Sequence, residues 1–138
     1  IPLADREPLA QDILQQITTT SFDLDMLVGQ IPLPQQQLVV IARALVNRPN
    51  ILILDEATAA LDMDDRNHLF EALRQFLKEG KMILYISHRM DEVLELSDEV
   101  TVLRSGLKVD TLPREDVSSD KLLQLVQSPL VTAENSHE

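Results

Sequence analysis

The 138-residue sequence has no cysteine, no tryptophan and only four other aromatic residues, three Phe and one Tyr. Without cysteine there can be no disulfide framework, no thiolate zinc site and no thiol nucleophile, and the composition fits a cytosolic protein. With so few aromatic side chains, the core must consist mainly of Leu, Ile and Val. An aliphatic core of this kind suits helices packed on a buried sheet.

Basic residues are scarce as well, since 12 Lys and Arg stand against 23 Asp and Glu, which gives a net charge of −11. Binding to a nucleic-acid backbone or to anionic lipid needs clustered positive charge, so the composition argues against both. No apolar run approaches the roughly 20 residues that a membrane-spanning helix needs, and no signal peptide is recognisable. We therefore expect a chain that is soluble by itself and binds no nucleic acid.

The hydrophobic residues, 44% of the chain, are enough to bury one core, so we expect one compact domain or a large part of one. Their spacing predicts an irregular lead-in over residues 1–8 and strands over residues 51–54, 82–86 and 100–103. A turn at residues 104–106 leads into residues 107–112. Helices are predicted over residues 9–17, from residue 35 to about residue 46, and over residues 67–79, 90–96 and 118–126.

Alternation of helices and strands is typical of an α/β fold with a mostly parallel sheet and right-handed crossovers. The strands over residues 51–54 and 82–86 are apolar at every position, or nearly so, as expected for strands buried on both faces. The fold class predicted is therefore α/β, with helices flanking a mostly parallel sheet.

Polar groups follow two of these strands directly, at the edge of the sheet where α/β proteins concentrate their chemistry. Asp55 and Glu56 come after the first strand, and Ser87 and His88 after the second. An Asp at a strand end can bind Mg²⁺, an adjacent Glu can polarise an attacking water, and a His can contact a transferring phosphoryl group. Ordinary loop or capping residues are the alternative for each pair alone. Both pairs together favour a phosphate site.

Four motifs, in this order, carry a resemblance to a known family: QQQLVVIARAL, ILILDEATAALD, ISHRMDEV and SDEVTVLRSG. Together they resemble the second half of an ABC-type ATPase cassette, over roughly residues 9–126. The chain is most similar to the ATPases of bacterial sugar importers, especially the first of their two fused cassettes. The resemblance implies a partial P-loop NTPase-like fold, with a helical signature region over residues 1–48, a core over residues 49–126 and a polar tail over residues 127–138.

The same resemblance implies roles for single residues. Asp55 corresponds to the Walker B carboxylate associated with Mg²⁺, directly or through water, and Glu56 to the general base or water-orienting residue. His88 corresponds to the switch histidine that senses the γ-phosphate of ATP. The family's D-loop, which crosses the dimer interface, corresponds to Ala59, Ala60, Leu61 and Asp62. For Asp62, helix N-capping is an additional or alternative role.

The signature motif of the family corresponds to Ile31, Pro32, Leu33, Pro34 and Gln35, so that Gln35 is a candidate nucleotide-binding residue. In the family this motif begins a helix whose N-terminus faces the γ-phosphate bound by the partner cassette. Here Pro32 replaces the usual Ser and Pro34 a usual Gly. The signature is therefore degenerate, since one hydroxyl and two backbone N–H donors are lost. Proline itself is well tolerated at the start of a helix.

A P-loop requires the pattern Gly-x-x-x-x-Gly-Lys-Ser/Thr, and the three glycines of this chain, Gly29, Gly80 and Gly106, do not form it. We therefore expect part of a cassette that lacks its P-loop-bearing N-terminal strands, is inactive alone and leaves some apolar surface exposed. Two functions remain open. One is the ATP-hydrolysing subunit of a sugar importer; the other is a non-catalytic pseudo-ATPase module that pairs with an active cassette.

The implied partners are a second cassette, in a homodimer, heterodimer or fused chain, and membrane permease subunits, with a substrate-binding protein acting indirectly. The implied location is the cytoplasmic face of the plasma membrane. A translation or DNA-repair member of the same superfamily is a third option, which the charge of −11 disfavours.

Overall fold

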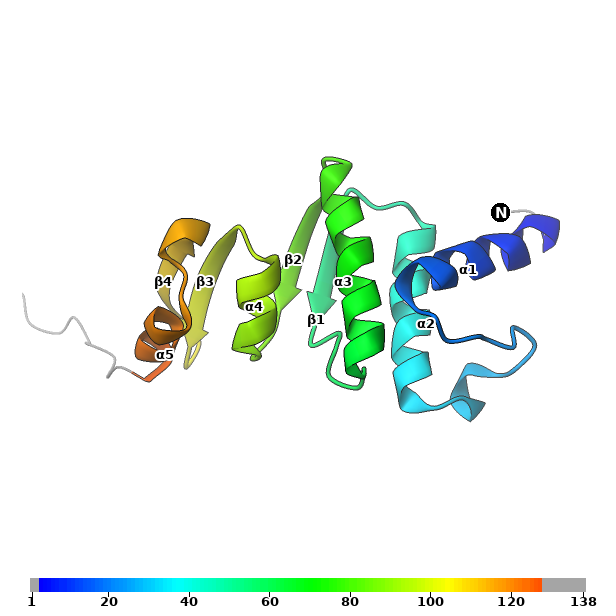
Figure 1. Ribbon diagram of the computed structural model, residues 1–138, viewed down its shortest axis with the longest axis horizontal. Helices are drawn as coiled ribbons and strands as arrows, with labels where there is room; N and C mark the ends of the chain where they lie inside the picture. The colour runs from blue at the N-terminus through cyan, green and yellow to red at the C-terminus, as the bar shows by residue number, and fades with distance from the viewer. Residues whose placement is uncertain (1–2, 128–138) are drawn as a thin grey trace, which may run out of the picture. The chain divides into compact units, whose positions relative to one another are not determined.

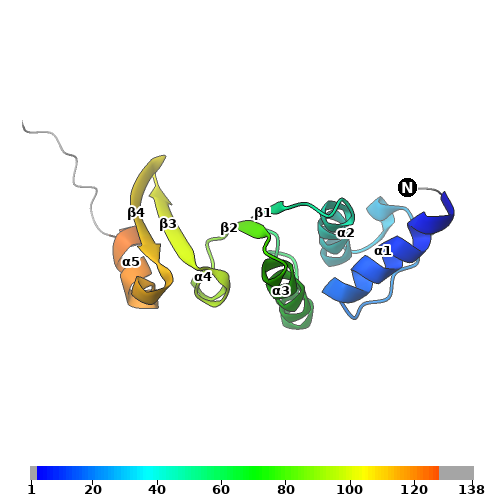
Figure 2. The same ribbon diagram turned by 90° about the horizontal axis from the view of Figure 1, so that it is seen from above.

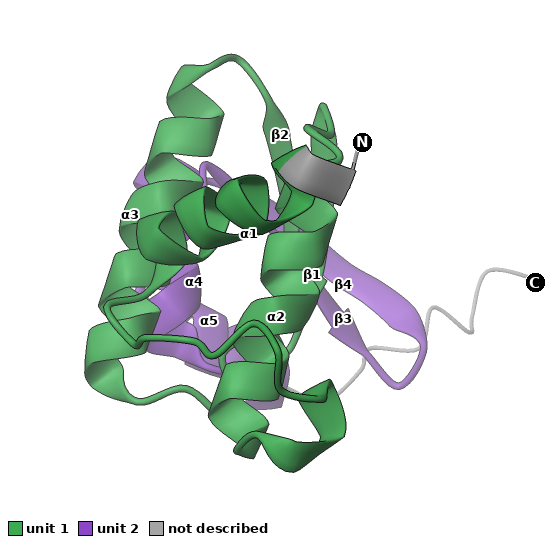
Figure 3. Ribbon diagram, turned by 90° about the vertical axis from the view of Figure 1, so that its right-hand side faces the viewer, with its two compact units in different colours: residues 1–87 green, residues 88–138 purple. Residues whose placement is uncertain are grey.

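A computed structural model describes residues 3–127 of the chain (Figure 1). The chain divides into two compact units, residues 1–87 and residues 88–138, which Figure 3 colours separately. The division between residues 1–48 and 49–126 rests on motifs and stays a prediction. Of the predicted tail only Gln127 is described, and residues 128–138 lie outside the described residues.

The first unit combines helices with a two-stranded parallel sheet. Its elements in chain order are α1 (Leu3–Ile17), the short 3₁₀ helix η1 (Val28–Gln30), α2 (Leu33–Val46), β1 (Ile51–Asp55), α3 (Met63–Lys78) and β2 (Met82–Ile86). The helices predicted from residues 35 and 67 begin a little earlier than expected, at Leu33 and Met63. The two strands lie where the sequence predicts them.

One face of the parallel pair is covered and the other is exposed. α3 packs against β2, on the face that includes the buried side chains of Leu52 and Leu54 (Figure 2). The prediction that both strands are buried on both faces is wrong for the opposite face, because no element of the first unit among residues 3–87 covers it. We call this opposite face the exposed sheet face; it consists of Ile51, Ile53, Met82, Leu84 and Ile86.

The first helix begins at Leu3, so the prediction of an irregular lead-in over residues 1–8 is wrong for its described part. Pro8 lies inside α1. A proline inside a helix removes one backbone hydrogen bond, normally at a considerable cost. Pro8 lies in the second turn of α1 and is exposed, so water can bond a carbonyl that loses its partner on this side of the helix.

Both ends of α3 follow the sequence rules for helix capping. At the N-terminus the Asp62 carboxylate accepts a hydrogen bond from the Asp65 backbone N–H at 2.9 Å, which confirms the predicted capping role of Asp62. At the C-terminus the helix ends before Gly80, whose φ of 78° is in the region that glycine adopts most readily. The buried side chain of Asp65 also accepts a hydrogen bond from the Thr18 hydroxyl, which connects α3 to the end of α1.

The second unit contains α4 (Met90–Leu96), β3 (Glu99–Arg104), β4 (Leu107–Pro113), the 3₁₀ helix η2 (Arg114–Asp116) and α5 (Ser119–Gln127). The strand predicted at residues 100–103 does not extend a parallel sheet but forms an antiparallel hairpin with β4. The cause is the tight turn at Ser105 and Gly106, both of which have positive φ, as two-residue hairpin turns require. The hairpin and α5 share a small core of Val102, Leu112, Val117 and Leu122.

The last helix has a cap at each end. The Ser118 hydroxyl accepts a hydrogen bond from the Lys121 backbone N–H at 3.2 Å, as expected for an N-cap. The Arg104 guanidinium donates to the carbonyls of Leu125 and Val126, at 3.2 and 3.0 Å. A cation near the last carbonyls of a helix is favourable, so Arg104 connects the end of α5 to the hairpin.

Candidate functional site

The predicted carboxylate pair lies at the carboxyl end of the parallel strands. Asp55 is the last residue of β1, is exposed, and stands opposite Ile86, the last residue of β2. Glu56 follows it and is half-buried. Two carboxylates therefore stand at consecutive positions at the edge of the sheet where α/β proteins place their chemistry.

The backbone of Glu56 has an unusual conformation. Its φ is 49°, a left-handed value that few residues other than glycine adopt, and its N–H donates to the Ile86 carbonyl at 2.9 Å. A residue in this region is strained by about 1–3 kcal/mol and stays there only if its surroundings fix it. The strain therefore coincides with the carboxylate predicted to orient water.

A compact turn joins Glu56 to α3 and contains the predicted D-loop. Within it, the Ala59 N–H donates to the Glu56 carbonyl at 3.2 Å, and the Leu61 N–H donates to the Thr58 carbonyl at 3.0 Å. Of the D-loop residues, Ala59 and Asp62 are exposed, whereas Ala60 and Leu61 are half-buried. The side chain of Ala59 is thus accessible.

Sequence reasoning missed a hydroxyl pair that connects this turn to the neighbouring strand. The Thr58 hydroxyl lies 3.2 Å from the Tyr85 hydroxyl, and Thr58 is almost fully buried. The Tyr85 ring packs edge-on against Phe70 of α3, with ring centroids 6.1 Å apart. The available signal was Tyr85 itself, the one residue with a polar group in the strand MILYI.

The residues predicted to form a degenerate signature lie at the start of α2. Pro32 is the N-cap residue, has no side-chain capping bond, and its carbonyl accepts the first helical hydrogen bond from the Gln36 N–H at 3.0 Å. Pro34 occupies the second helical position, so Leu33 and Gln35 supply the backbone N–H groups of positions N1 and N3. The Gln36 side chain donates to the Ile31 carbonyl at 2.9 Å. The helix is intact, while the donors that proline lacks are missing from its N-terminus.

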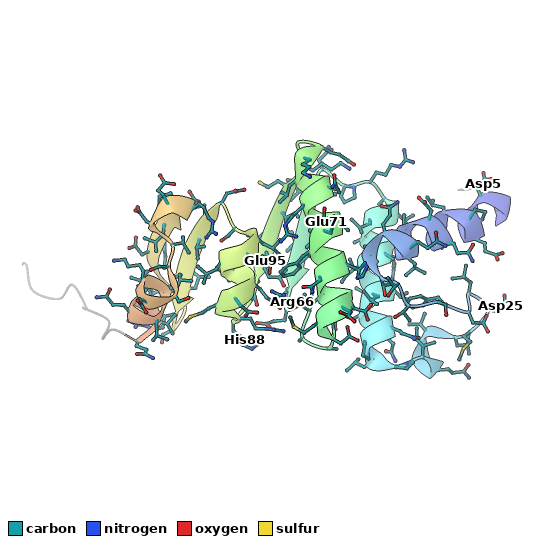
Figure 4. All side chains as sticks on the ribbon, in the orientation of Figure 1. Asp5, Asp25, Arg66, Glu71, His88 and Glu95 are labelled. Atoms are coloured by element: carbon teal, nitrogen blue, oxygen red, sulfur yellow. The ribbon has the colours of Figure 1, made fainter. Side chains whose placement is uncertain are left out.

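His88 is the first residue of the second unit and is exposed; Figure 4 labels it at the start of α4. The next residue, Arg89, is the N-cap of α4 and forms ion pairs with Asp91 at 3.4 Å and with Glu92 at 3.3 Å. Glu92 is fully buried, which the sequence did not indicate. The structure thus brings Asp55 and Glu56 together at one strand end and places His88 in the other unit.

The carboxylates fit one kind of metal site. Mg²⁺ is usually bound by one or two carboxylates, with phosphate and water oxygens completing its shell. The exposed Asp55 carboxylate beside Glu56 matches that donor set. Over residues 3–127, no group of three or more His, Cys, Asp or Glu side chains could bind a metal ion. The donor set fits a cation whose remaining ligands are phosphate or water oxygens.

The first unit also contains a cavity of about 610 Å³ between α1, α2 and residues 22–31. Its lining is mostly apolar and includes Leu14, Phe22 and Val39. Of the predicted site residues, Ile31 lines it, whereas Asp55 and Glu56 do not. The cavity is therefore a feature of the helical region, separate from the carboxylate pair.

Comparisons with known proteins show what these features are similar to. The sequence profile described as ABC transporter matches residues 5–59, a range that includes the predicted signature and Asp55–Glu56. The ribose import ATP-binding protein of Burkholderia ambifaria is 45% identical over 125 residues, which are 88% of this chain and 24% of that protein. A ribose import ATP-binding protein of Rhizobium johnstonii is 36% identical over 118 residues, 86% of this chain and 23% of that protein. The chain thus spans about a quarter of the length of the curated relatives it matches.

A solved structure shows the same fold. A dimeric ATP-binding cassette in a post-hydrolysis state, bound to ADP and Pi, superposes with a TM-score of 0.76 at 23% identity, over 83% of this chain and 49% of that one. The chain therefore has the fold of part of an ABC-type ATPase cassette, which confirms the predicted fold class. Within that class, its sequence is similar to the ATP-binding proteins of bacterial sugar importers, as the motifs indicated. Among residues 3–127, no helix is both long and apolar enough to span a membrane.

Proposed function

We propose that this chain is the C-terminal part of an ATP-hydrolysing cassette that powers the import of a sugar. The substrate class is supported by the ribose import ATP-binding proteins, which match 88% and 86% of this chain. The order of motifs and the cassette fold support the reaction class. In this proposal, residues 1–48 form the helical signature region and residues 49–126 the region from Walker B onward.

The residues at the end of β1 have distinct roles in the proposed reaction. Asp55 binds Mg²⁺, directly or through water, and the cation would supply charge neutralisation at the phosphates of ATP. Glu56 orients the attacking water and accepts its proton. His88 contacts the γ-phosphate. The main support is the position of Glu56, which follows the strand tip in a strained conformation fixed by Ile86.

The remaining site residues act across a dimer in this proposal. The D-loop, from Ala59 to Asp62, contacts a second cassette and couples the two ATP sites. The N-terminus of α2, including Gln35, faces the nucleotide bound by that cassette. Permease subunits bring the dimer to the cytoplasmic face of the plasma membrane, and a substrate-binding protein delivers the sugar to them. Supporting this, the cassette with similar fold was solved as a dimer.

A second candidate is a pseudo-ATPase module that pairs with an active cassette. It is favoured by Pro32 and Pro34, which remove donors from the helix that should bind the partner's nucleotide. The intact Asp55, Glu56 and His88 favour hydrolysis instead.

The decisive experiment compares the chain alone with a completed cassette, meaning this chain joined to a P-loop-bearing N-terminal segment. ATP binding and phosphate release are measured for both, each beside a Glu56→Gln variant. We expect no appreciable nucleotide binding by the chain alone, and Glu56-dependent turnover by the completed cassette. Binding of Mg-ATP without any turnover that depends on Glu56 would refute hydrolysis and leave the pseudo-ATPase function.

A further inference from the structure

The hydroxyl pair of Thr58 and Tyr85 connects three elements around the carboxylate pair. Tyr85 lies on β2 directly opposite Leu54 of β1, in the pairing next to Asp55 and Ile86. Its hydroxyl lies 3.2 Å from that of Thr58, two residues beyond Glu56. Its ring packs against Phe70 of α3, which is fully buried. Figure 1 shows β1, β2 and α3 side by side.

The turn that starts at Glu56 needs restraint from its surroundings, because a left-handed φ of 49° is unfavourable for a glutamate. The backbone restrains this turn at its start, through the bond from the Glu56 N–H to the Ile86 carbonyl. Further along, the Ala59 N–H bonds back to the Glu56 carbonyl. Between Glu56 and Ala59, the Thr58 hydroxyl adds a side-chain restraint. It contacts Tyr85 of β2, the strand that also contains Ile86.

We propose that Thr58 and Tyr85 are positioning residues, which orient the Glu56 carboxylate through the turn between them. This inference rests on the proposed function, in which Glu56 orients the attacking water. Neither hydroxyl is assigned contact with nucleotide. Their effect is geometric, and a reacting group displaced by about 1 Å can lose about 100-fold in rate.

The chemistry of the pair allows its role in orientation to be separated from its role in packing. Tyr85→Phe removes one oxygen and keeps the ring against Phe70. Thr58→Val keeps the shape of the side chain without the hydroxyl, and Thr58→Ser restores a hydroxyl at the same position. Thr101→Val is the matched control, because Thr101 forms a hydroxyl pair with Thr111, at 2.9 Å, on the hairpin of the second unit.

The test measures kcat and KM for ATP, together with the melting temperature, in the completed cassette. We expect Tyr85→Phe and Thr58→Val each to lower kcat by about five- to tenfold, with KM within about twofold of the wild-type value. Thr58→Ser should recover most of the lost kcat, and Thr101→Val should leave kcat unchanged. The double variant should be no slower than the slower single variant, because both substitutions break one interaction.

Several outcomes would overturn the inference. One is unchanged kcat in Tyr85→Phe and Thr58→Val while Glu56→Gln abolishes turnover; then the proposed function stands and the positioning role fails. A second is loss of kcat in step with melting temperature, without recovery in Thr58→Ser, which indicates packing alone. If Glu56→Gln itself leaves turnover unchanged, both the proposed function and the positioning role fail.

Discussion

The Glu56 N–H and the Ile86 carbonyl form a 2.9 Å hydrogen bond that fixes the first residue after β1 to the last residue of β2. This bond extends the pairing of the two strands by one step beyond Asp55, just where the chain turns away. The side chain of Glu56 is therefore presented from a rigid strand end. A rigid support of this kind suits a group that must orient a water molecule.

Replacing Glu56 should separate stability from activity. Glu56→Gly should be more stable than Glu56→Ala by about 1 kcal/mol, because glycine adopts a φ of 49° without the penalty that a Cβ atom brings. Urea unfolding of both variants measures the difference. At Glu71, an exposed position inside α3 (Figure 4), the order should reverse, since glycine destabilises a helix interior. An alanine variant at Glu56 as stable as the glycine variant would contradict the strain argument.

Removing the cap of α3 should destabilise the first unit. Asp62→Ala removes the acceptor of the Asp65 N–H, and we expect a loss of about 1 kcal/mol in the free energy of unfolding. Asp62→Asn retains an acceptor oxygen and should lose much less. Asp64→Ala, at an exposed position in the same helical turn, is the control for lost negative charge near the helix N-terminus. Equal losses in Asp62→Ala and Asp64→Ala would show that the cap contributes nothing beyond its charge.

The exposed sheet face should promote self-association of the isolated chain. Parallel strands are normally covered on both faces, yet Ile53 and Leu84 are 63% and 52% exposed here. The double variant Ile53→Thr, Leu84→Thr has a β-branched side chain that suits a strand at both positions, and it exposes less apolar area. Sedimentation velocity should show weaker concentration-dependent association in this variant. Val40→Thr, at an exposed position on α2, should have little effect; an equal reduction there would rule out a specific role for the sheet face.

Restoring the signature residues should raise ATP turnover at the site of the partner cassette. Pro32→Ser with Pro34→Gly returns a hydroxyl and two N–H donors to the start of α2. One hydrogen bond to a charged acceptor contributes about 1.5–3 kcal/mol, so turnover at the partner's site should rise by about tenfold or more. The measurement uses the completed cassette in its dimeric form. Pro8→Ala, in α1, is the control for general removal of proline, and unchanged turnover in the double variant would show that this helix does not contact the nucleotide.

Much of the fold could be predicted because the signals are local. The apolar face of α2, with Leu38, Ile41 and Ala42 buried, follows directly from spacings of three and four residues. Asp62 and Gly80 mark the ends of α3 through capping chemistry that depends on neighbouring residues alone. Asp55 and Glu56 were predicted at a strand end for the same reason, since a polar pair directly follows an apolar run.

The features that escaped prediction depend on longer-range geometry. The start of α1 at Leu3 was missed because proline is a strong helix breaker, and the exposure that makes Pro8 tolerable appears only in the fold. The left-handed φ of Glu56 depends on its bond to a strand 30 residues further on. The pair of Thr58 and Tyr85, 27 residues apart, requires the register of β1 against β2. Such contacts follow from tertiary structure, and local sequence patterns do not reveal them.

The most direct test of the account is one turnover of bound ATP by the completed cassette, with wild-type Glu56 and with Glu56→Gln. Both proteins should bind Mg-ATP with similar affinity, because the glutamine keeps the size of the side chain. Phosphate release should be slower in the variant by about 100-fold or more, the usual contribution of a general base. Equal release rates with ATP bound in both proteins would contradict the assignment of Glu56 and, with it, the proposed site at the end of β1.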